Sequence, residues 1–154
     1  MYIRTEVLIM SSKINYTRNI HTKTPYPKRD KISLLPIDKF NIHSELDNVS
    51  KTIGKFNGEI EWRKMWTLEE AITRTETNHK LFILLEDNEP IGHVWFDGGF
   101  LYNAFVSKER TNGDSVWFIE ECIFIIKEKK ISLVVDKWNK RAIRFWEKLH
   151  FKKD

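Results

Sequence analysis

The sequence predicts a mixed α/β domain (α+β in layout), with a mostly antiparallel central sheet and helices on both of its faces. Two observations carry this prediction. Residues 81–106 contain three apolar segments separated by short turns, which is typical of an antiparallel meander. From residue 113 onward the pattern becomes helix, strand, helix. Because the chain has 154 residues, we expect a single domain over 1–154.

The first part of the chain is predicted from alternation and from turn residues. Residues 1–30 would be two strands and a proline-containing basic arm, and residues 31–154 would be the core. Gly54 and Gly58 predict a loop between two helical stretches. The expected elements are strands at 2–10, 13–20 and 31–37, a weak helix at 38–52 and a helix at 61–74.

The second part is predicted from length and periodicity. Residues 113–129 are too long for a strand and end in a charged run, which favours a buried helix. Residues 138–149 place apolar residues on one helical stripe beside a basic stripe. The expected elements are strands at 81–86, 91–96, 100–106 and 131–135 and helices at 113–129 and 138–149.

Charge is uneven along the chain, although the formal net charge is only +4. Residues 1–31 and 137–154 each carry +5, and the stretch between them carries −6. Basic ends can attract a polyanion, and they are equally compatible with a solvated surface. Cys122 is the only cysteine, so we expect no internal disulfide, a buried thiol and a cytoplasmic location. No apolar run is long enough to span a membrane.

A phosphate-binding loop is predicted in FVSKERTNGDSVW, residues 105–117. A strand would end at Val106, and a short loop would lead directly into a helix. Free N–H groups at a helix start bind phosphate, and the helix dipole favours the negative charge. A plain helix cap at Asn112 would explain the same residues. The candidate loop residues are Arg110, Thr111, Asn112, Gly113, Asp114 and Ser115.

A second motif follows at the right separation, WNKRAIRFWEKLHF at residues 138–151. Together the two motifs resemble the GNAT superfamily of N-acetyltransferases, well over residues 81–151 and in general layout over 31–80. In that family the fourth strand ends in a bulge, and an Arg/Gln-x-x-Gly-x-Gly/Ala loop binds the pyrophosphate of acetyl-CoA. A later asparagine opens the helix that flanks the pantetheine. The resemblance therefore implies acetyl-CoA as the cofactor.

Carried over by position, the resemblance assigns roles to individual residues. Phe105 and Val106 would offer backbone groups to the pantetheine, and the loop Arg110 to Ser115 would hold the pyrophosphate. Asn139 would contact the cofactor. Trp146 stands where the family usually has the tyrosine that protonates the CoA thiolate, and an indole N–H donates hydrogen bonds but is no practical proton source. Core packing is the alternative role of Trp146.

Two departures from the family pattern have structural consequences. Asp114 would repel a diphosphate unless it points to solvent, and it can also favour a helix start. Family members add two strands after the Gly-Phe that His150-Phe151 replaces. We hypothesise that residues 2–10 and 13–20 fill that space, which would otherwise leave a sheet edge open and make a homodimer plausible.

The leading function is transfer of an acetyl group to a primary amine, by direct attack in a ternary complex with a backbone N–H near Val106 stabilising the oxyanion. The acceptor would be a small-molecule or peptide amine. Candidate catalytic groups are Tyr102, Asn103 and Asp136, with His93 as a further titratable side chain that is more often structural. The histidines show no metal-ligand spacing, so no metal is expected.

The alternative function is a catalytically degenerate binding protein on the same scaffold. The missing tyrosine hydroxyl and the absence of a carboxylate on strand 100–106 favour it. Its partner would be a protein or a nucleic acid, held by the basic ends. Tyr16, Tyr26 and Trp138 would then stack on bases, with the arm at residues 21–30 as the first contact.

Overall fold

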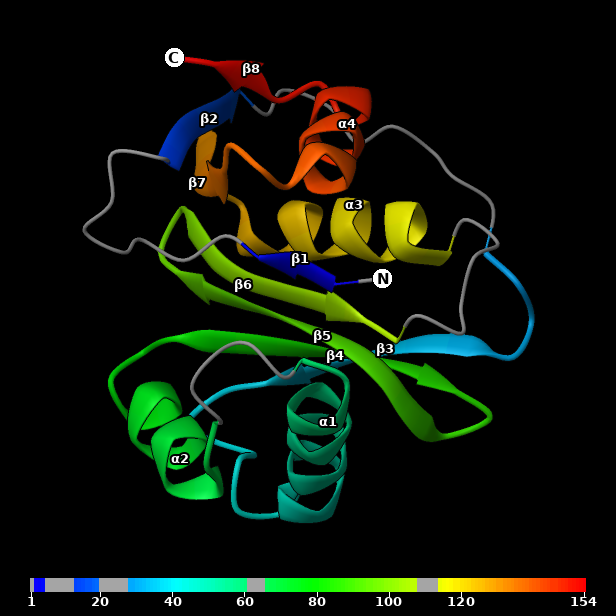
Figure 1. Ribbon diagram of the computed structural model, residues 1–154. Helices are drawn as coiled ribbons and strands as arrows, with labels where there is room; N and C mark the ends of the chain where they lie inside the picture. Colours follow the sequence, from blue (N-terminus) through cyan, green and yellow to red (C-terminus); the bar gives the residue numbers. More distant parts are fainter. Residues whose placement is uncertain (1, 5–12, 20–27, 61–65, 108–113) are drawn as a thin grey trace.

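The computed structural model describes residues 2–4, 13–19, 28–60, 66–107 and 114–154. They form one mixed sheet with a pair of helices on each face (Figure 1), which confirms the predicted fold class. The strands are β1 (Tyr2–Arg4), β2 (Lys13–Asn19), β3 (Ile32–Ile37), β4 (Lys80–Glu86), β5 (Glu89–Asp97), β6 (Phe100–Val106), β7 (Lys130–Asp136) and β8 (Lys152–Lys153). The helices are α1 (Leu46–Glu59), α2 (Leu68–Glu76), α3 (Asp114–Ile126) and α4 (Lys140–Lys148).

The sheet order is β3-β4-β5-β6-β7-β2-β8, and β1 pairs with β6. The consecutive strands β3, β4, β5 and β6 pair antiparallel with one another. Strands β6 and β7 are parallel and are joined through α3. A parallel pair needs such a crossover. Pro36 is tolerated because β3 lies at the edge of the sheet, where a missing N–H breaks no ladder.

The N-terminal part of the chain completes the far side of the sheet. Strand β2 pairs with β7 along its whole length, from Lys13 opposite Asp136 to Asn19 opposite Lys130. The short β8 then pairs with β2. The hypothesis that N-terminal strands fill the space beyond β7 is therefore confirmed for β2. Of the predicted strand at 2–10, only Tyr2–Arg4 lies within the described residues.

Helices α1 and α2 cover one face of the sheet, and α3 and α4 cover the other (Figure 1). The predicted loop at Gly54 and Gly58 is wrong, because both residues lie inside α1. A buried stripe of Val49, Ile53 and Phe56 stabilises the helix there, and this packing outweighs the low helix propensity of glycine. The predicted helix at 38–52 accordingly begins later.

Helix α2 begins at Leu68 because the Thr67 hydroxyl caps it, accepting a hydrogen bond from the Glu70 N–H at 3.1 Å. The first residues of the predicted helix at 61–74 lie outside the described part of the chain. Within that part, no helix is long and apolar enough to cross a membrane.

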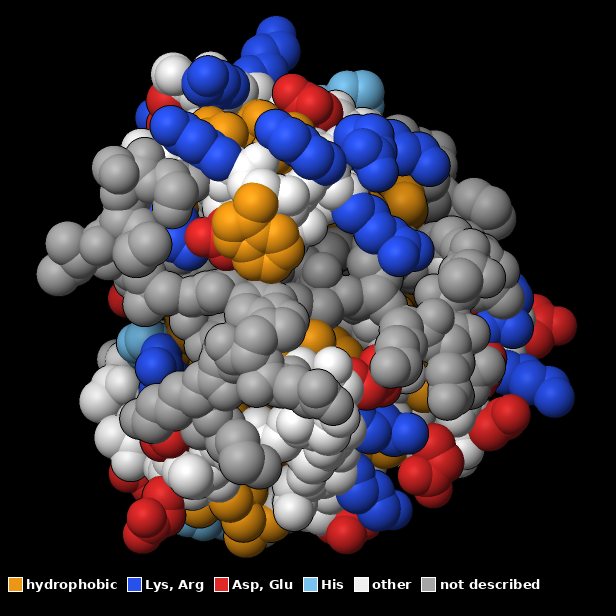
Figure 2. All heavy atoms as spheres, in the orientation of Figure 1, with side chains coloured by type: hydrophobic (Ala, Val, Ile, Leu, Met, Phe, Trp, Pro, Cys, Tyr) orange, Lys and Arg blue, Asp and Glu red, His pale blue; other side chains and the backbone are white. Residues whose placement is uncertain are grey.

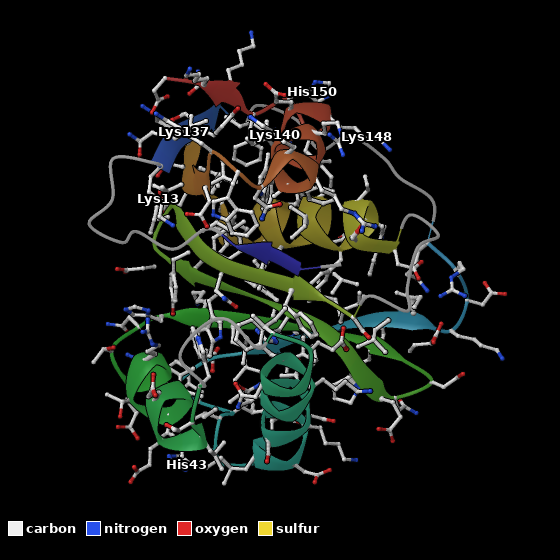
Figure 3. All side chains as sticks on the ribbon, in the orientation of Figure 1. Lys13, His43, Lys137, Lys140, Lys148 and His150 are labelled. Carbon is white, nitrogen blue, oxygen red and sulfur yellow. The ribbon has the colours of Figure 1, made fainter. Side chains whose placement is uncertain are left out.

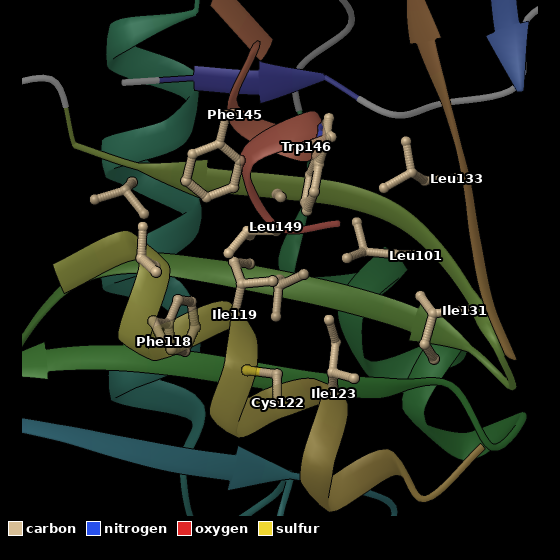
Figure 4. Packing of buried hydrophobic residues seen from close by; sticks show 14 of the residues in the cluster. Leu101, Phe118, Ile119, Cys122, Ile123, Ile131, Leu133, Phe145, Trp146 and Leu149 are labelled. Carbon is tan, nitrogen blue, oxygen red and sulfur yellow. The ribbon is translucent and has the colours of Figure 1, made fainter. Parts of the chain in front are cut away.

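Two apolar clusters lie on the two faces of the sheet. The cluster under α3 and α4 includes Cys122, which is fully buried as predicted (Figure 4). Trp146 lies in the same cluster, packed edge-on against Phe145 and Phe151. The cluster under α1 and α2 is rich in aromatic rings, with Trp66 stacked on Trp95 at 5.4 Å between ring centroids.

Candidate functional site

An opening in the sheet lies between β6 and β7. Their ladder contains a single registered pair, Phe100 opposite Ser132, at the start of β6. The Ser132 N–H also donates to the Gly99 carbonyl at 2.9 Å. A Cβ on Gly99 would lie 2.6 Å from the Lys130 carbonyl oxygen, so glycine permits this close approach. Beyond this point the two described strands pair no further, so the edge of β6 toward Val106 has no partner in β7.

A β-bulge interrupts β6 just after this point. Trp95 of β5 lies opposite Asn103, but the next residue, Phe96, lies opposite Leu101, so Tyr102 is the extra residue. Because of the bulge, Tyr102 and Asn103 both direct their side chains to the face covered by α1 and α2. The resemblance implies a bulge in this strand, and the structure has one four positions before Val106.

A buried hydrogen-bond chain joins α1 to the bulge. His93 Nδ1 lies 2.8 Å from the Thr52 hydroxyl, and His93 Nε2 lies 3.0 Å from Asn103 Oδ1. Both ring nitrogens are engaged, so His93 is a structural histidine here. Asn103 Nδ2 is buried and has no hydrogen-bond partner among the described atoms.

Tyr102 occupies an aromatic cluster rather than an open site. Its hydroxyl lies 2.8 Å from His79 Nδ1, and its ring stacks near Trp66 and Trp95. The Arg74 guanidinium lies over the ring, 5.0 Å from its centroid. Burial raises the pKa of Tyr102 well above its usual 10, against the opposing effect of Arg74. Tyr102 is thus a neutral phenol that can donate or accept a hydrogen bond.

The other predicted residues at the opening have structural partners. Asp136 is buried and forms an ion pair with Lys13, which ties β7 to β2. Asn139 Oδ1 caps α4 by accepting from the Ala142 N–H at 3.1 Å. Trp146 has no exposed surface and lies in an apolar cluster, which agrees with its alternative role in core packing, and its contact with a cofactor stays a prediction. Its indole N–H is a buried donor without an acceptor among the described atoms.

The start of α3 is described from Asp114, whereas Arg110, Thr111, Asn112 and Gly113 of the predicted phosphate loop lie outside the described residues. Asp114 does not point to solvent, which was the condition under which it would not repel a diphosphate. It is buried, and Arg29 donates to its two carboxylate oxygens at 3.1 and 2.6 Å. Arg29 also binds Glu86 at 2.6 Å. Arg29 therefore offsets part of the negative charge at the helix start, because it pairs with Glu86 as well as with Asp114, and Ser115 is half-buried beside this ion pair.

Sequence reasoning missed two residues near this site. Arg29 belongs to the basic arm, far from Asp114 along the chain, and no local pattern connects them. Glu59, at the end of α1, accepts a hydrogen bond from the Ser107 hydroxyl at 2.8 Å. Ser107 directly follows β6, so a carboxylate does lie near that strand, although none lies on it. Only the packing of α1 on the sheet reveals it.

The N-terminal strand β1 lies along the free edge of β6. It runs antiparallel to β6, with Tyr2 opposite Phe105, Ile3 opposite Ala104 and Arg4 opposite Asn103. Because β5 occupies the other edge of β6, β1 must lie on the side where β7 has parted from it (Figure 1). The pairing begins directly after the bulge and covers the positions of Phe105 and its two predecessors.

Comparison with solved structures identifies the fold. A GCN5-related N-acetyltransferase from Sphaerobacter thermophilus matches with a TM-score of 0.65 and 13% identity, over 99% of this chain and 50% of that one. An aminoglycoside acetyltransferase from an uncultured soil metagenomic sample matches with a TM-score of 0.56 and 11% identity, over 77% of this chain and 87% of that one. A conserved Staphylococcus epidermidis protein of unknown function matches with a TM-score of 0.64 and 11% identity, over 92% of this chain and 57% of that one.

These likenesses define a GNAT-like fold. This chain spans only about half the length of the Sphaerobacter protein. No family model matches the sequence, and no curated protein matches it either.

The residues at the opening suit an acyl-CoA in two respects and oppose it in one. The start of α3 is a helix N-terminus whose Asp114 carboxylate is paired with Arg29, and Trp146 contributes a buried donor without an acceptor among the described atoms. The opposing feature is β1, which already pairs with the β6 edge that a pantetheine would use. An extended ligand could pair with that edge of β6 only after β1 had left it.

Proposed function

We propose that this protein is an acetyl-CoA-dependent N-acetyltransferase that acts on a primary amine. The observation that carries the proposal is the opening between the parallel strands β6 and β7, with a bulge at Tyr102 and the start of α3 at its far end. Acetyl-CoA, when bound, supplies an activated acyl group for direct attack by the amine.

The residues of the chain bind and orient the reactants. Backbone groups of β6 after the bulge hold the extended arm of the cofactor, and an N–H there stabilises the oxyanion. The N-terminus of α3 binds the phosphates, while Arg29 keeps Asp114 from repelling them. The buried Trp146 N–H has no acceptor among the described atoms, so it can donate a hydrogen bond to the cofactor from the position that the resemblance gives to the family's tyrosine.

The proton of the attacking amine has two carboxylates as possible destinations near the opening. Asp136 is held by Lys13 at the end of β7, and Glu59 is held by Ser107 beside the end of β6. Comparison of Asp136→Asn with Glu59→Gln in a pH–rate profile identifies the base. The variant of the true base loses the rise of rate with pH, whereas the other variant keeps it.

Binding is tested first, by thermal unfolding with and without acetyl-CoA. A ligand at 100 times its dissociation constant adds about 2.7 kcal/mol, which is a rise of roughly 5–10 °C for a domain of this size. Turnover is then measured as thiol release with a panel of small amines and N-terminal peptides. Absence of any shift at millimolar acetyl-CoA, in the full chain and in a variant that lacks β1, would overturn the proposal.

A second candidate function rests on a basic face formed by α4, β8 and their flanking residues. Lysines and arginines gather at this end of the molecule (Figures 2 and 3). All are exposed, and none forms an ion pair within the described residues; they are Lys137, Lys140, Arg141, Arg144, Lys148, Lys152 and Lys153. Trp138 is 59% exposed among them. Cations around an exposed indole suit single-stranded nucleic acid.

Of the three stacking residues expected from the sequence, the structure contradicts Tyr16 and leaves Tyr26 untested. Tyr16 is buried at 2% exposure, so it cannot stack on a base, and Tyr26 lies outside the described residues. Fluorescence anisotropy with a labelled oligonucleotide tests the candidate. We expect binding that weakens with salt, and a smaller salt slope in the double variant Lys140→Glu/Arg144→Glu. Lys39→Glu/Lys55→Glu, remote from this face, is the matched control with the same net charge.

A further inference from the structure

We propose that β1 is a built-in competitor of the cofactor, so that the N-terminal strand must leave β6 before acetyl-CoA can bind. This inference rests on the proposed function and adds a means of regulation at the same site. It comes from the position of β1, which no sequence pattern predicted to lie on β6.

The backbone geometry places β1 where a second extended chain would lie. Only one edge of β6 is open, because β5 pairs with the other along the strand. On the open edge, β7 pairs with the start of β6 at Phe100, and β1 pairs with Asn103 to Phe105. A strand edge offers one row of N–H and C=O groups, so it serves one extended partner at a time. Two ligands of this edge therefore exclude each other.

The length and attachment of β1 suit a reversible partner. It has three residues, so few backbone bonds stabilise it and it opens at low cost. Residues 5–12 tether it to β2, which is anchored along all of β7. A tethered segment acts at a high effective concentration, so a weak strand can still compete with a soluble ligand. β1 also packs beside α4, the helix that carries Trp146.

Competition of this kind lowers apparent affinity by the fraction of molecules whose site is open. If β1 is docked in nine of ten molecules, its removal raises the affinity for acetyl-CoA about tenfold. A partner that captures the N-terminus would have the same effect. The strand thus couples the state of the N-terminus to cofactor binding, without any change in the residues that would contact the cofactor.

Two variants test the inference by calorimetric titration with acetyl-CoA. One lacks residues 2–4, and we expect it to bind about tenfold more tightly than the full chain. The other, Ile3→Cys/Ala104→Cys, places two thiols directly opposite each other across β1 and β6. In an antiparallel ladder, directly opposed residues form either a hydrogen-bonded or a non-hydrogen-bonded pair, and the Cα–Cα distance of either kind of pair lies in the range that a disulfide spans. Oxidation should abolish binding and a reductant should restore it, with the Ala104→Cys single variant as the control.

The outcomes separate this inference from the proposed function. Equal binding by the full chain, the truncated chain and the oxidised double variant would overturn the competition and leave the acetyltransferase proposal standing. Absence of binding in all of them, including the truncated and the reduced proteins, would overturn both. If the truncated chain fails to fold, the oxidised and reduced forms of the double variant still decide the question.

Discussion

Arg18 of β2 and Glu120 of α3 form an ion pair inside the protein, although 102 residues separate them along the chain. Arg18 also donates to the Leu149 carbonyl at 3.0 Å, so one guanidinium joins β2, α3 and the end of α4. Both side chains are almost completely buried. The pair fixes the N-terminal strand β2 to the helices on one face of the sheet.

Removal of either partner should strongly destabilise the protein. Arg18→Met leaves the Glu120 carboxylate buried and unpaired, and we expect a loss of about 3–5 kcal/mol in the free energy of unfolding. The double variant Arg18→Met/Glu120→Leu removes both charges and should recover most of that loss. Urea denaturation of the single and double variants measures the difference. An additive effect in the double variant would show that the pair contributes little.

His150 occupies a backbone position that favours glycine. Its φ is 68°, and the Phe151 and His150 N–H groups return to the Trp146 and Glu147 carbonyls at 3.1 and 3.0 Å. This is the Schellman ending of a helix, in which the left-handed residue is usually glycine. We expect His150→Gly to stabilise the protein by about 0.5–1 kcal/mol, the relief of strain less the added freedom of the unfolded chain.

Thermal unfolding checks this prediction, with His150→Ala as the control that keeps the strain. The alanine variant should not be more stable than the natural chain, because it retains a Cβ at positive φ. A gain of the same size in both variants would mean that the imidazole, and not the backbone, is unfavourable at this position.

The raised pKa of buried Tyr102 predicts that the protein loses stability at high pH. Burial raises the pKa of its hydroxyl in the folded protein above the 10 expected in the unfolded chain. Below pH 10 both states hold the proton, so Tyr102 contributes no pH dependence there. Above pH 10 the unfolded state releases it first, and the free energy of unfolding falls by up to about 1.4 kcal/mol for each pH unit.

Chemical denaturation at pH 9 and pH 11 measures this fall in the natural chain and in Tyr102→Phe. The variant loses the hydrogen bond to His79 and should be less stable at pH 9. Its further loss between the two pH values should be smaller. Tyr16, whose pKa burial also raises, is present in both proteins and contributes equally to their slopes. Equal slopes in the two proteins would contradict the prediction.

The sequence predicted the sheet and its helices because their signals are local. The meander of β4, β5 and β6 follows from apolar runs and turns, and α4 follows from its stripe of apolar residues. The prediction of a loop at the glycines of α1 was wrong. Only the packing of the helix on the sheet shows that buried Val49 and Phe56 stabilise a helix that contains these glycines. The partners of Asp114 and the position of β1 come from distant parts of the chain, which no local pattern connects.

Arg29 is predicted to support cofactor binding without touching the reacting atoms. It pairs with Asp114 at the start of α3, where the phosphates bind under the proposed function. Arg29→Ala should weaken acetyl-CoA binding about tenfold, because an unpaired carboxylate then faces the diphosphate. Asp114→Asn in the Arg29→Ala background should restore most of the affinity. Failure of that second substitution to restore binding would assign Arg29 a direct contact with the cofactor instead.

Trp146 offers a direct test of the missing proton donor. The resemblance to the GNAT superfamily assigns it the position of a tyrosine, and its indole N–H is buried without an acceptor among the described atoms. Trp146→Tyr introduces a phenol that can protonate a departing thiolate, whereas Trp146→Phe leaves a space of similar size without the hydroxyl. Under the proposed function, we expect the tyrosine variant to turn over at least about tenfold faster than the phenylalanine variant, since a positioned general acid contributes about 10²–10⁴-fold.

Rates of thiol release across pH 7 to 11, at saturating acetyl-CoA, measure this difference. The tyrosine variant should also lose rate at alkaline pH as its phenol ionises, a limb that the natural chain and the phenylalanine variant lack. The pH limb distinguishes proton donation from better packing, because a packing effect would raise the rate equally at every pH. Equal rates in the two variants would show that the thiolate leaves without a proton from this position.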